Sequence, residues 1–94
     1  MSEKYYVYIV GNARPTLYIG VTKNLPKRMD EHQKGLVEGF TSHYKLTKLL
    51  YLEEHKLFID ALARERQLKH WNRQWKLELI QKHNPSLQDL TGTL

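Results

Sequence analysis

Two short stretches of β-branched and aromatic residues, separated by six residues, constrain this chain's fold more than any other feature. Residues 5–10 read YYVYIV and residues 17–21 read LYIGV, and both compositions are typical of strands. The intervening residues 11–15 read GNARP, which is turn chemistry. A connection this short cannot carry the chain to a parallel partner, so the sequence predicts an antiparallel hairpin.

The hairpin is followed by a predicted helix. Asn24 is a suitable N-cap, and Pro26 is tolerated in the first helical turn. Apolar residues recur at helical spacing from there until Gly35, where we expect the helix to end. We expect residues 36–44 to form a loop.

One strand and two helices are predicted further along, at residues 46–54, 58–71 and 73–83. The order β-β-α-β-α-α favours an α/β fold of the α+β kind, with a small three-stranded, mostly antiparallel sheet flanked by three helices. We expect residues 1–90 to form a single domain and residues 91–94 a loose C-terminal tail.

The charge distribution indicates a polyanionic partner. The formal net charge is +5, and residues 61–82 carry six basic residues against two acidic ones. A basic stripe of this kind suits nucleic acid, although a solvated basic surface is the alternative. The chain has no cysteine, which excludes disulfides and thiolate zinc sites. No apolar run approaches the roughly 20 residues needed to span a bilayer, and the N-terminus lacks a signal-peptide pattern. We therefore expect a cytoplasmic protein with no membrane association, and we favour a monomer.

Glu65 is the most informative carboxylate. It falls on the apolar stripe that Phe58, Ala61, Leu62 and Leu68 trace along the predicted helix. Desolvating a charged carboxylate costs several kcal/mol unless it is paired or bound to a cation. A metal ion at a cleft edge and a salt bridge with a nearby cation, such as the neighbouring lysine, are both consistent with the pattern.

Four further residues can carry chemistry. Arg28 and His32 are four residues apart, so they share one side of a helix. Arg28 offers a planar, permanently charged fork for phosphate oxygens, and His32 can exchange a proton near neutral pH. Tyr8 and Tyr18 lie on neighbouring predicted strands, where tyrosine is more often a packing residue than a catalytic one.

In this order and spacing, these residues resemble the GIY-YIG nucleases over nearly the whole chain. The most specific stretches are residues 17–22 (LYIGVT) and residues 63–69 (ARERQLK), which is similar to the family's glutamate-bearing helix. The end of the chain resembles the small stand-alone bacterial members. Those are mostly uncharacterised, and they are similar to the nuclease domains of structure-selective DNA-repair enzymes.

The resemblance implies a role for each residue. Tyr8 matches the general base that activates water, and Tyr18 the tyrosine that binds the phosphate region and helps the proton relay. Gly20 allows close backbone approach, and Arg28 neutralises charge on the attacked phosphate. His32 occupies a position where some members have tyrosine and others histidine.

The resemblance also implies a cofactor and a substrate. Glu65 matches the family's single metal-binding carboxylate, which would hold one Mg²⁺ or Mn²⁺ together with waters. The residues expected to contact nucleic acid are Gly20, Lys27, Arg64, Arg66, Lys69 and Arg73. The implied activity is metal-dependent hydrolysis of DNA phosphodiesters that leaves a 5′-phosphate and a 3′-hydroxyl. The enzyme would select its DNA substrate by structure, in branched, flap or nicked DNA. Its cellular role would be linked to repair or recombination.

One of two departures from the family pattern keeps other functions open. Tyr6 replaces the glycine of the first motif, a departure that small stand-alone members share. Val21 follows Gly20 where some active members have a lysine near the tyrosines, and this departure, with the basic stripe, keeps a non-catalytic function open. Without that lysine, base activation depends on the metal, Arg28 or His32. The alternatives are a non-catalytic nucleic-acid-binding module that retains the GIY-YIG fold, and a partner-binding domain that keeps only the fold.

Overall fold

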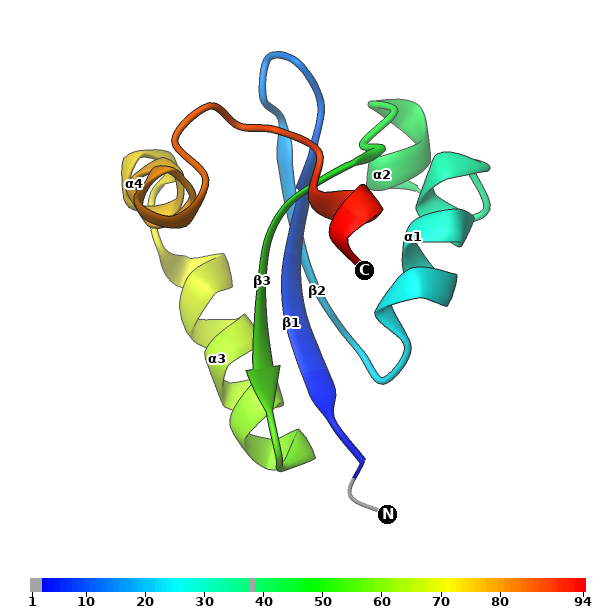
Figure 1. Ribbon diagram of the computed structural model, residues 1–94. Helices are drawn as coiled ribbons and strands as arrows, with labels where there is room; N and C mark the ends of the chain where they lie inside the picture. The colour runs from blue at the N-terminus through cyan, green and yellow to red at the C-terminus, as the bar shows by residue number, and fades with distance from the viewer. Residues whose placement is uncertain (1–2, 38) are drawn as a thin grey trace.

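The computed structural model describes residues 3–37 and 39–94, and Figure 1 shows the arrangement. The elements follow in the order β1 (Tyr5–Gly11), β2 (Leu17–Thr22), α1 (Leu25–Gln33), α2 (Phe40–His43), β3 (Lys48–His55), α3 (Phe58–His70), α4 (Arg73–His83) and the 3₁₀ helix η1 (Leu90–Thr93). The strands form one sheet in the order β2-β1-β3, with both pairings antiparallel. The predicted fold class and the predicted hairpin are confirmed.

The central strand β1 is buried on both faces of the sheet. Its side chains alternate, so Val7 and Ile9 pack in one apolar cluster while Tyr8 and Val10 pack in another. The first cluster includes residues of α3 and α4, and the second includes residues of α1. Figure 1 shows α3 and α4 on one side of the sheet and α1, α2 and η1 on the other. This alternation places Tyr8 on the side that α1 covers.

The local signals for α1 are confirmed. The Asn24 side chain accepts a hydrogen bond from the Lys27 backbone N–H at 3.2 Å, which caps the helix, and Pro26 lies in the first turn. The helix ends at Gln33, close to the predicted Gly35. Gly35 has a φ of 71°, the left-handed conformation that commonly follows a helix.

Two short helices lie where the sequence predicted irregular structure. Helix α2 lies in the predicted loop of residues 36–44, and the buried Thr41 donates a hydrogen bond from Oγ1 to the Val37 carbonyl at 3.1 Å. Four residues are too few to show helical periodicity in a sequence, which explains why the loop prediction was wrong here.

The residues just before the expected tail of residues 91–94 are held against the sheet. The Asp89 carboxylate accepts hydrogen bonds from the backbone N–H groups of Leu49 and Thr91, both at 3.0 Å. Leu90 packs against the cluster that contains Tyr8. These contacts fasten η1 to β3 and close the α1 side of the sheet. Across the described ranges 3–37 and 39–94, no helix is long and apolar enough to cross a membrane.

Candidate active site

Tyr8 and Gly20 lie opposite each other on the paired strands β1 and β2. The Tyr8 side chain is buried, with 1 % of its surface exposed, and its ring lies against the backbone of Gly20. A Cβ atom at Gly20 would lie 2.5 Å from Tyr8 Oη and 2.6 Å from Tyr8 Cζ. Only glycine leaves space for the phenol at this point of the sheet.

We therefore expect Gly20→Ala to destabilise the protein by about 1–3 kcal/mol, the usual cost of overpacking a core. The Tyr8 phenol cannot move away freely because its hydroxyl is hydrogen-bonded. Urea unfolding followed by circular dichroism measures the effect. Gly92→Ala is the matched control, since a Cβ there meets nothing within 4 Å, and we expect its effect to stay within about 0.5 kcal/mol. Equal stability of the two variants would contradict the close contact.

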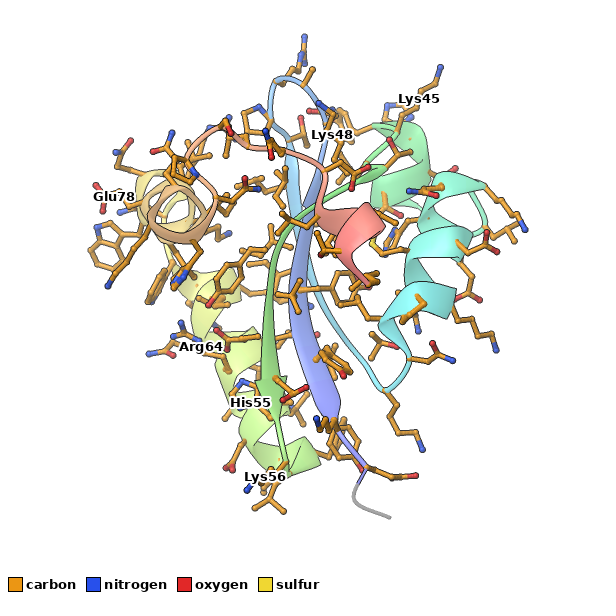
Figure 2. All side chains as sticks on the ribbon, viewed as in Figure 1. Lys45, Lys48, His55, Lys56, Arg64 and Glu78 are labelled. Atoms are coloured by element: carbon orange, nitrogen blue, oxygen red, sulfur yellow. The ribbon has the colours of Figure 1, made fainter. Side chains whose placement is uncertain are left out.

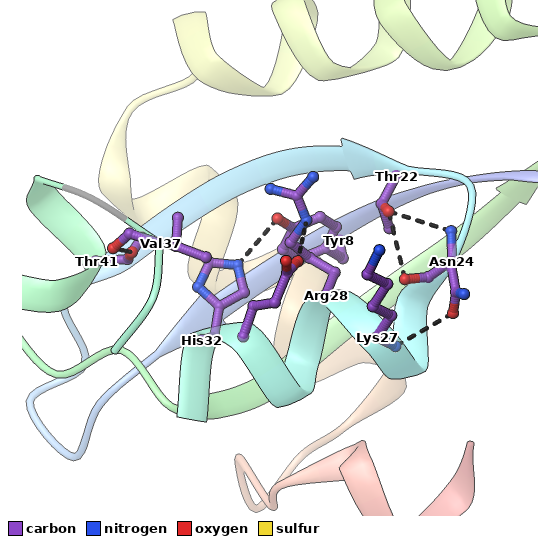
Figure 3. A network of polar contacts seen from close by, with 9 residues as sticks. Tyr8, Thr22, Asn24, Lys27, Arg28, His32, Val37 and Thr41 are labelled. Carbon is purple, nitrogen blue, oxygen red and sulfur yellow. Dashed lines mark hydrogen bonds and ion pairs between the residues drawn. The ribbon is translucent and has the colours of Figure 1, made fainter. Parts of the chain in front are cut away.

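His32 is the hydrogen-bond partner of Tyr8. It lies in the last turn of α1, on the face that Leu25 and Met29 also bury. Its Nε2 atom is 3.0 Å from Tyr8 Oη, and the residue is 3 % exposed (Figure 3). Burial lowers the pKa of His32, and the positive charge of Arg28 lowers it further. His32 is therefore neutral at pH 7.

Burial also raises the pKa of the Tyr8 phenol far above the ordinary tyrosine value, although Arg28 partly opposes the shift. Tyr8 and His32 are thus two neutral groups that share one hydrogen bond. The second imidazole nitrogen, His32 Nδ1, is buried and has no hydrogen-bond partner among the described residues. Within residues 3–37 and 39–94, the Tyr8 hydroxyl is the hydrogen-bond partner that orients the imidazole.

Arg28 lies one turn before His32 on α1. Its Nε atom is 3.5 Å from Glu31 Oε1, and its side chain is partly exposed. Figure 3 shows Arg28 and His32 extending from α1 toward Tyr8. The charge of Arg28 acts on the pKa of both Tyr8 and His32, which places a cation next to the neutral pair.

Helix α3 brings Glu65 and Lys69 to the same region from the other side of β2. The Tyr18 ring centroid is 6.1 Å from that of His32, and Lys69 Nζ is 5.8 Å from the Tyr18 ring centroid. Lys69 Nζ is also 3.6 Å from a Glu65 carboxylate oxygen, and the Glu65 side chain is 16 % exposed. Glu65 contributes to the raised pKa of Tyr8. The salt bridge considered from the sequence is therefore present, and Glu65 is not sealed in the core.

A groove of about 610 Å³ opens next to this group of residues. Its lining comprises Tyr5, Val21, Thr22, Lys23, Asn24, Lys27, Arg28, Glu31 and Phe58. Of the five residues expected to be catalytic, only Arg28 lines it. Tyr8 and His32 are buried, Tyr18 and Glu65 are half-buried, and none of these four belongs to the lining.

The six residues expected to contact nucleic acid are not all brought together. Lys27 lines the groove, while Arg66 and Arg73 are exposed on α3 and α4. Arg64 faces β3 instead: its Nε donates to Glu53 Oε1 at 2.9 Å and its guanidinium lies 5.3 Å from the Trp71 ring centroid. Figure 2 shows Arg64 and His55 at this α3–β3 side of the molecule. The structure therefore separates Arg64 from the Tyr8 region.

Sequence reasoning missed the polar cluster around Glu53. The Glu53 carboxylate accepts from Tyr51 Oη at 2.6 Å and from Arg64, and it lies 2.9 Å from His55 Nε2. Burial raises the pKa of Tyr51 to about 12, with help from Glu53. Burial favours a higher pKa for Glu53, but its hydrogen bonds outweigh this and hold the pKa below the ordinary value. The signal was present, because residues 51, 53 and 55 alternate along a strand and so share a face.

Two side chains outside the candidate site show how packing decides burial. Trp75 is exposed on α4, where its ring meets Trp71 edge-on at a centroid distance of 6.0 Å. His55 is partly buried beside Glu53. Both side chains are amphipathic, so their burial depends on how neighbouring elements pack.

Comparison with known proteins identifies the family. The sequence matches the GIY-YIG catalytic domain over residues 4–78. The chain belongs to the GIY-YIG family. It is 41% identical over 84 residues to a UPF0213 protein of Syntrophus aciditrophicus, covering 88% of this chain and 95% of that protein. It is 36% identical over 78 residues to a UPF0213 protein of Staphylococcus saprophyticus, covering 83% of this chain and 95% of that protein.

The fold comparison agrees with this assignment. The solution NMR structure of the UPF0213 protein BH0048 from Bacillus halodurans superimposes with a TM-score of 0.59 at 23% identity, covering 94% of each chain. At this identity the likeness supports the fold. Membership of the GIY-YIG family points to nucleic acid as the general class of substrate.

The residues of this GIY-YIG domain fit a divalent ion held largely by water. Within the described residues, no group of three or more histidine, cysteine, aspartate or glutamate side chains is placed to enclose a metal. Glu65 is a partly exposed carboxylate with a long ion pair to Lys69 at 3.6 Å. Mg²⁺ is commonly bound through one or two carboxylates while it keeps several waters. Glu65 can hold such an ion if Lys69 gives way.

Proposed function

We propose that this GIY-YIG domain is a divalent-metal-dependent endonuclease that hydrolyses DNA phosphodiester bonds, selecting its substrate by structure rather than sequence. Branched, flap and nicked DNA are the candidate substrates, and the link to repair or recombination rests on the family resemblance. The observation that carries the proposal is the Tyr8–His32 hydrogen bond, with Arg28 and Glu65 close enough to act on the same phenol.

The Tyr8–His32 pair supports a proton relay. A phenol with a raised pKa is a poor base by itself, because a buried phenolate is unfavourable. Neutral His32 provides an acceptor for the phenol proton. As attacking water gives a proton to Tyr8 Oη, the phenol proton passes to His32 Nε2 across the 3.0 Å hydrogen bond. No phenolate persists, and Val21 in place of a lysine is then compatible with catalysis.

Arg28 supports phosphate binding beside this relay. Its guanidinium is a rigid fork that matches two phosphate oxygens, and its charge opposes the negative charge that grows on the phosphate during attack. The contact with Glu31 at 3.5 Å is partly exposed and weak enough to yield to a phosphate. A divalent ion at Glu65 supplies Lewis-acid stabilisation of the leaving oxygen when it is bound.

A nicking assay on supercoiled plasmid, with flap and branched duplexes in parallel, tests this function. We expect cutting with Mg²⁺ or Mn²⁺, none after the metal is removed with EDTA, and its return when metal is added back. The ends should carry a 5′-phosphate and a 3′-hydroxyl, which ligation detects. A folded protein that cuts none of these substrates with either metal would overturn the proposal.

A non-catalytic nucleic-acid-binding module is the second candidate. The observations that favour it are the Glu65–Lys69 ion pair, which occupies the carboxylate proposed to hold the metal, and the 1 % exposure of Tyr8. This function predicts DNA affinity that falls with rising salt, together with no cutting under any metal. The nicking assay above separates the two.

A further inference from the structure

The groove beside Arg28 is lined by two kinds of side chain. Lys23, Lys27 and Arg28 are cationic, and Glu31 is the acidic residue of the lining. Tyr5, Val21 and Phe58 are aromatic or apolar. The volume of about 610 Å³ lies within the range of pockets that hold small ligands.

The cationic side chains of the lining have charge available for a ligand. Arg28 makes a 3.5 Å contact with Glu31, and Lys23 a 3.8 Å contact with Glu3, where both side chains are largely exposed. Lys27 has no ion pair with any residue in the described ranges, and Figure 3 shows it extending from the first turn of α1. Three cations against one carboxylate of the lining favour an anion here.

The aromatic side chains of the lining include an exposed ring. Phe58 is the first residue of α3 and is 50% exposed, and its ring lies 5.5 Å from that of Tyr5, centroid to centroid, at 56°. An exposed phenylalanine at the mouth of a groove costs hydrophobic stabilisation unless a ligand covers it. Planar bases stack on such rings whatever their identity.

We infer that this groove is a nucleotide subsite, in which a base stacks on the exposed ring of Phe58, beside Tyr5, while its phosphate is held by Lys27 and Arg28. A nucleotide joins a planar aromatic base to an anionic phosphate, and the groove joins the matching surfaces. The ligand is either a free nucleotide or one unit of a strand. The second case rests on the proposed function, since the strand would continue to the phosphate beside Tyr8.

Binding of fluorescein-labelled oligothymidine, measured by anisotropy in EDTA so that no cutting occurs, tests the subsite. We expect Phe58→Ala to weaken binding about tenfold, the effect of losing one stacked base. Its slope of log Kd against log salt should stay unchanged, because no charge is removed. Lys27→Gln should instead reduce that slope by about one. These two responses separate stacking from charge.

Ile59→Ala is the matched control, because Ile59 is the next residue of α3, is 71% exposed and lies outside the groove lining. We expect it to bind like the unaltered chain. Phe58→Leu keeps the apolar contact with Tyr5 but has no ring, so it should bind as weakly as Phe58→Ala, whereas Phe58→Trp should retain affinity. Thermal melts establish that each variant is folded.

Thymidine 5′-monophosphate distinguishes the two sources of the ligand. Amide shifts at Val21, Thr22 and Lys27 on titration, lost in Phe58→Ala, would support a site that takes free nucleotides. Phe58-dependent binding of the oligonucleotide without these shifts would support a strand subsite. Equal affinity of Phe58→Ala and Ile59→Ala for both probes would overturn the inference, even if the protein cuts DNA. Phe58-dependent binding with no cutting would overturn the proposed function and leave the subsite standing.

Discussion

Replacing Tyr8 with phenylalanine is expected to lower the rate of DNA cutting by about 100-fold or more, the range lost when a general base is removed. The substitution removes one oxygen, the Oη atom that lies 3.0 Å from His32 Nε2 and through which the proposed relay passes. Single-turnover plasmid cutting at saturating Mg²⁺ measures the chemical step.

The same substitution has a structural cost that needs a control. Without the Tyr8 hydroxyl, both nitrogens of the buried His32 lack a hydrogen-bond partner among the described residues, which costs about 1–3 kcal/mol. Tyr51→Phe is matched to it, because Tyr51 is also a buried tyrosine and loses a 2.6 Å hydrogen bond to Glu53. We expect Tyr51→Phe to lose comparable stability and to keep its cutting rate. If the two variants cut equally fast, Tyr8 is a packing residue.

Replacing Glu65 with glutamine is expected to reduce cutting by about 100-fold or more at the Mg²⁺ concentration that saturates the unaltered protein, since a catalytic metal supplies several kcal/mol. Glutamine keeps the shape of the side chain and removes the charge that attracts the ion. Excess Mn²⁺ should restore part of the activity if the substitution weakens metal binding. A rate with unchanged Mg²⁺ dependence would show that Glu65 is only the ion-pair partner of Lys69.

Glu78→Gln is the control for Glu65→Gln. Glu78 is an exposed glutamate on α4, and its side chain accepts a 3.2 Å hydrogen bond from Gln74. Both substitutions raise the formal net charge of +5 by one, so both should strengthen nonspecific attraction to DNA equally. A loss of cutting confined to Glu65→Gln therefore reports on the metal rather than on binding of the polyanion.

The two faces of β1 illustrate how far sequence reasoning reached. The β-branched and aromatic run predicted a strand, and the short turn predicted the hairpin, because both follow from backbone sterics over a few residues. The sequence did not indicate that Tyr8 would be sealed while Tyr18 would stay half-buried. The burial of each tyrosine depends on the helices that pack against the sheet, and these helices lie dozens of positions away in the sequence.

Glu65 and Arg64 on α3 are a second example. Both were recognised as charged residues of one helix, but successive residues of a helix are rotated by about 100°, so the two side chains contact different strands. Glu65 reaches the β2 side and pairs with Lys69, while Arg64 reaches Glu53 on β3. Helical periodicity predicts which residues share a face of a helix. The angle at which the helix packs on the sheet determines which residues each face contacts.

Sequence patterns predicted the three strands, the three longer helices, the antiparallel hairpin, the α1 cap at Asn24 and the family, since each depends on neighbouring residues or on a motif. Packing in three dimensions places the Tyr8 hydroxyl against His32 and brings Phe58 to the groove that Arg28 lines. Sequence patterns could not predict these placements, because they bring together residues 24 to 30 positions apart in the chain. Such contacts form when whole elements pack, and no local pattern encodes the distance between two side chains that meet across a core.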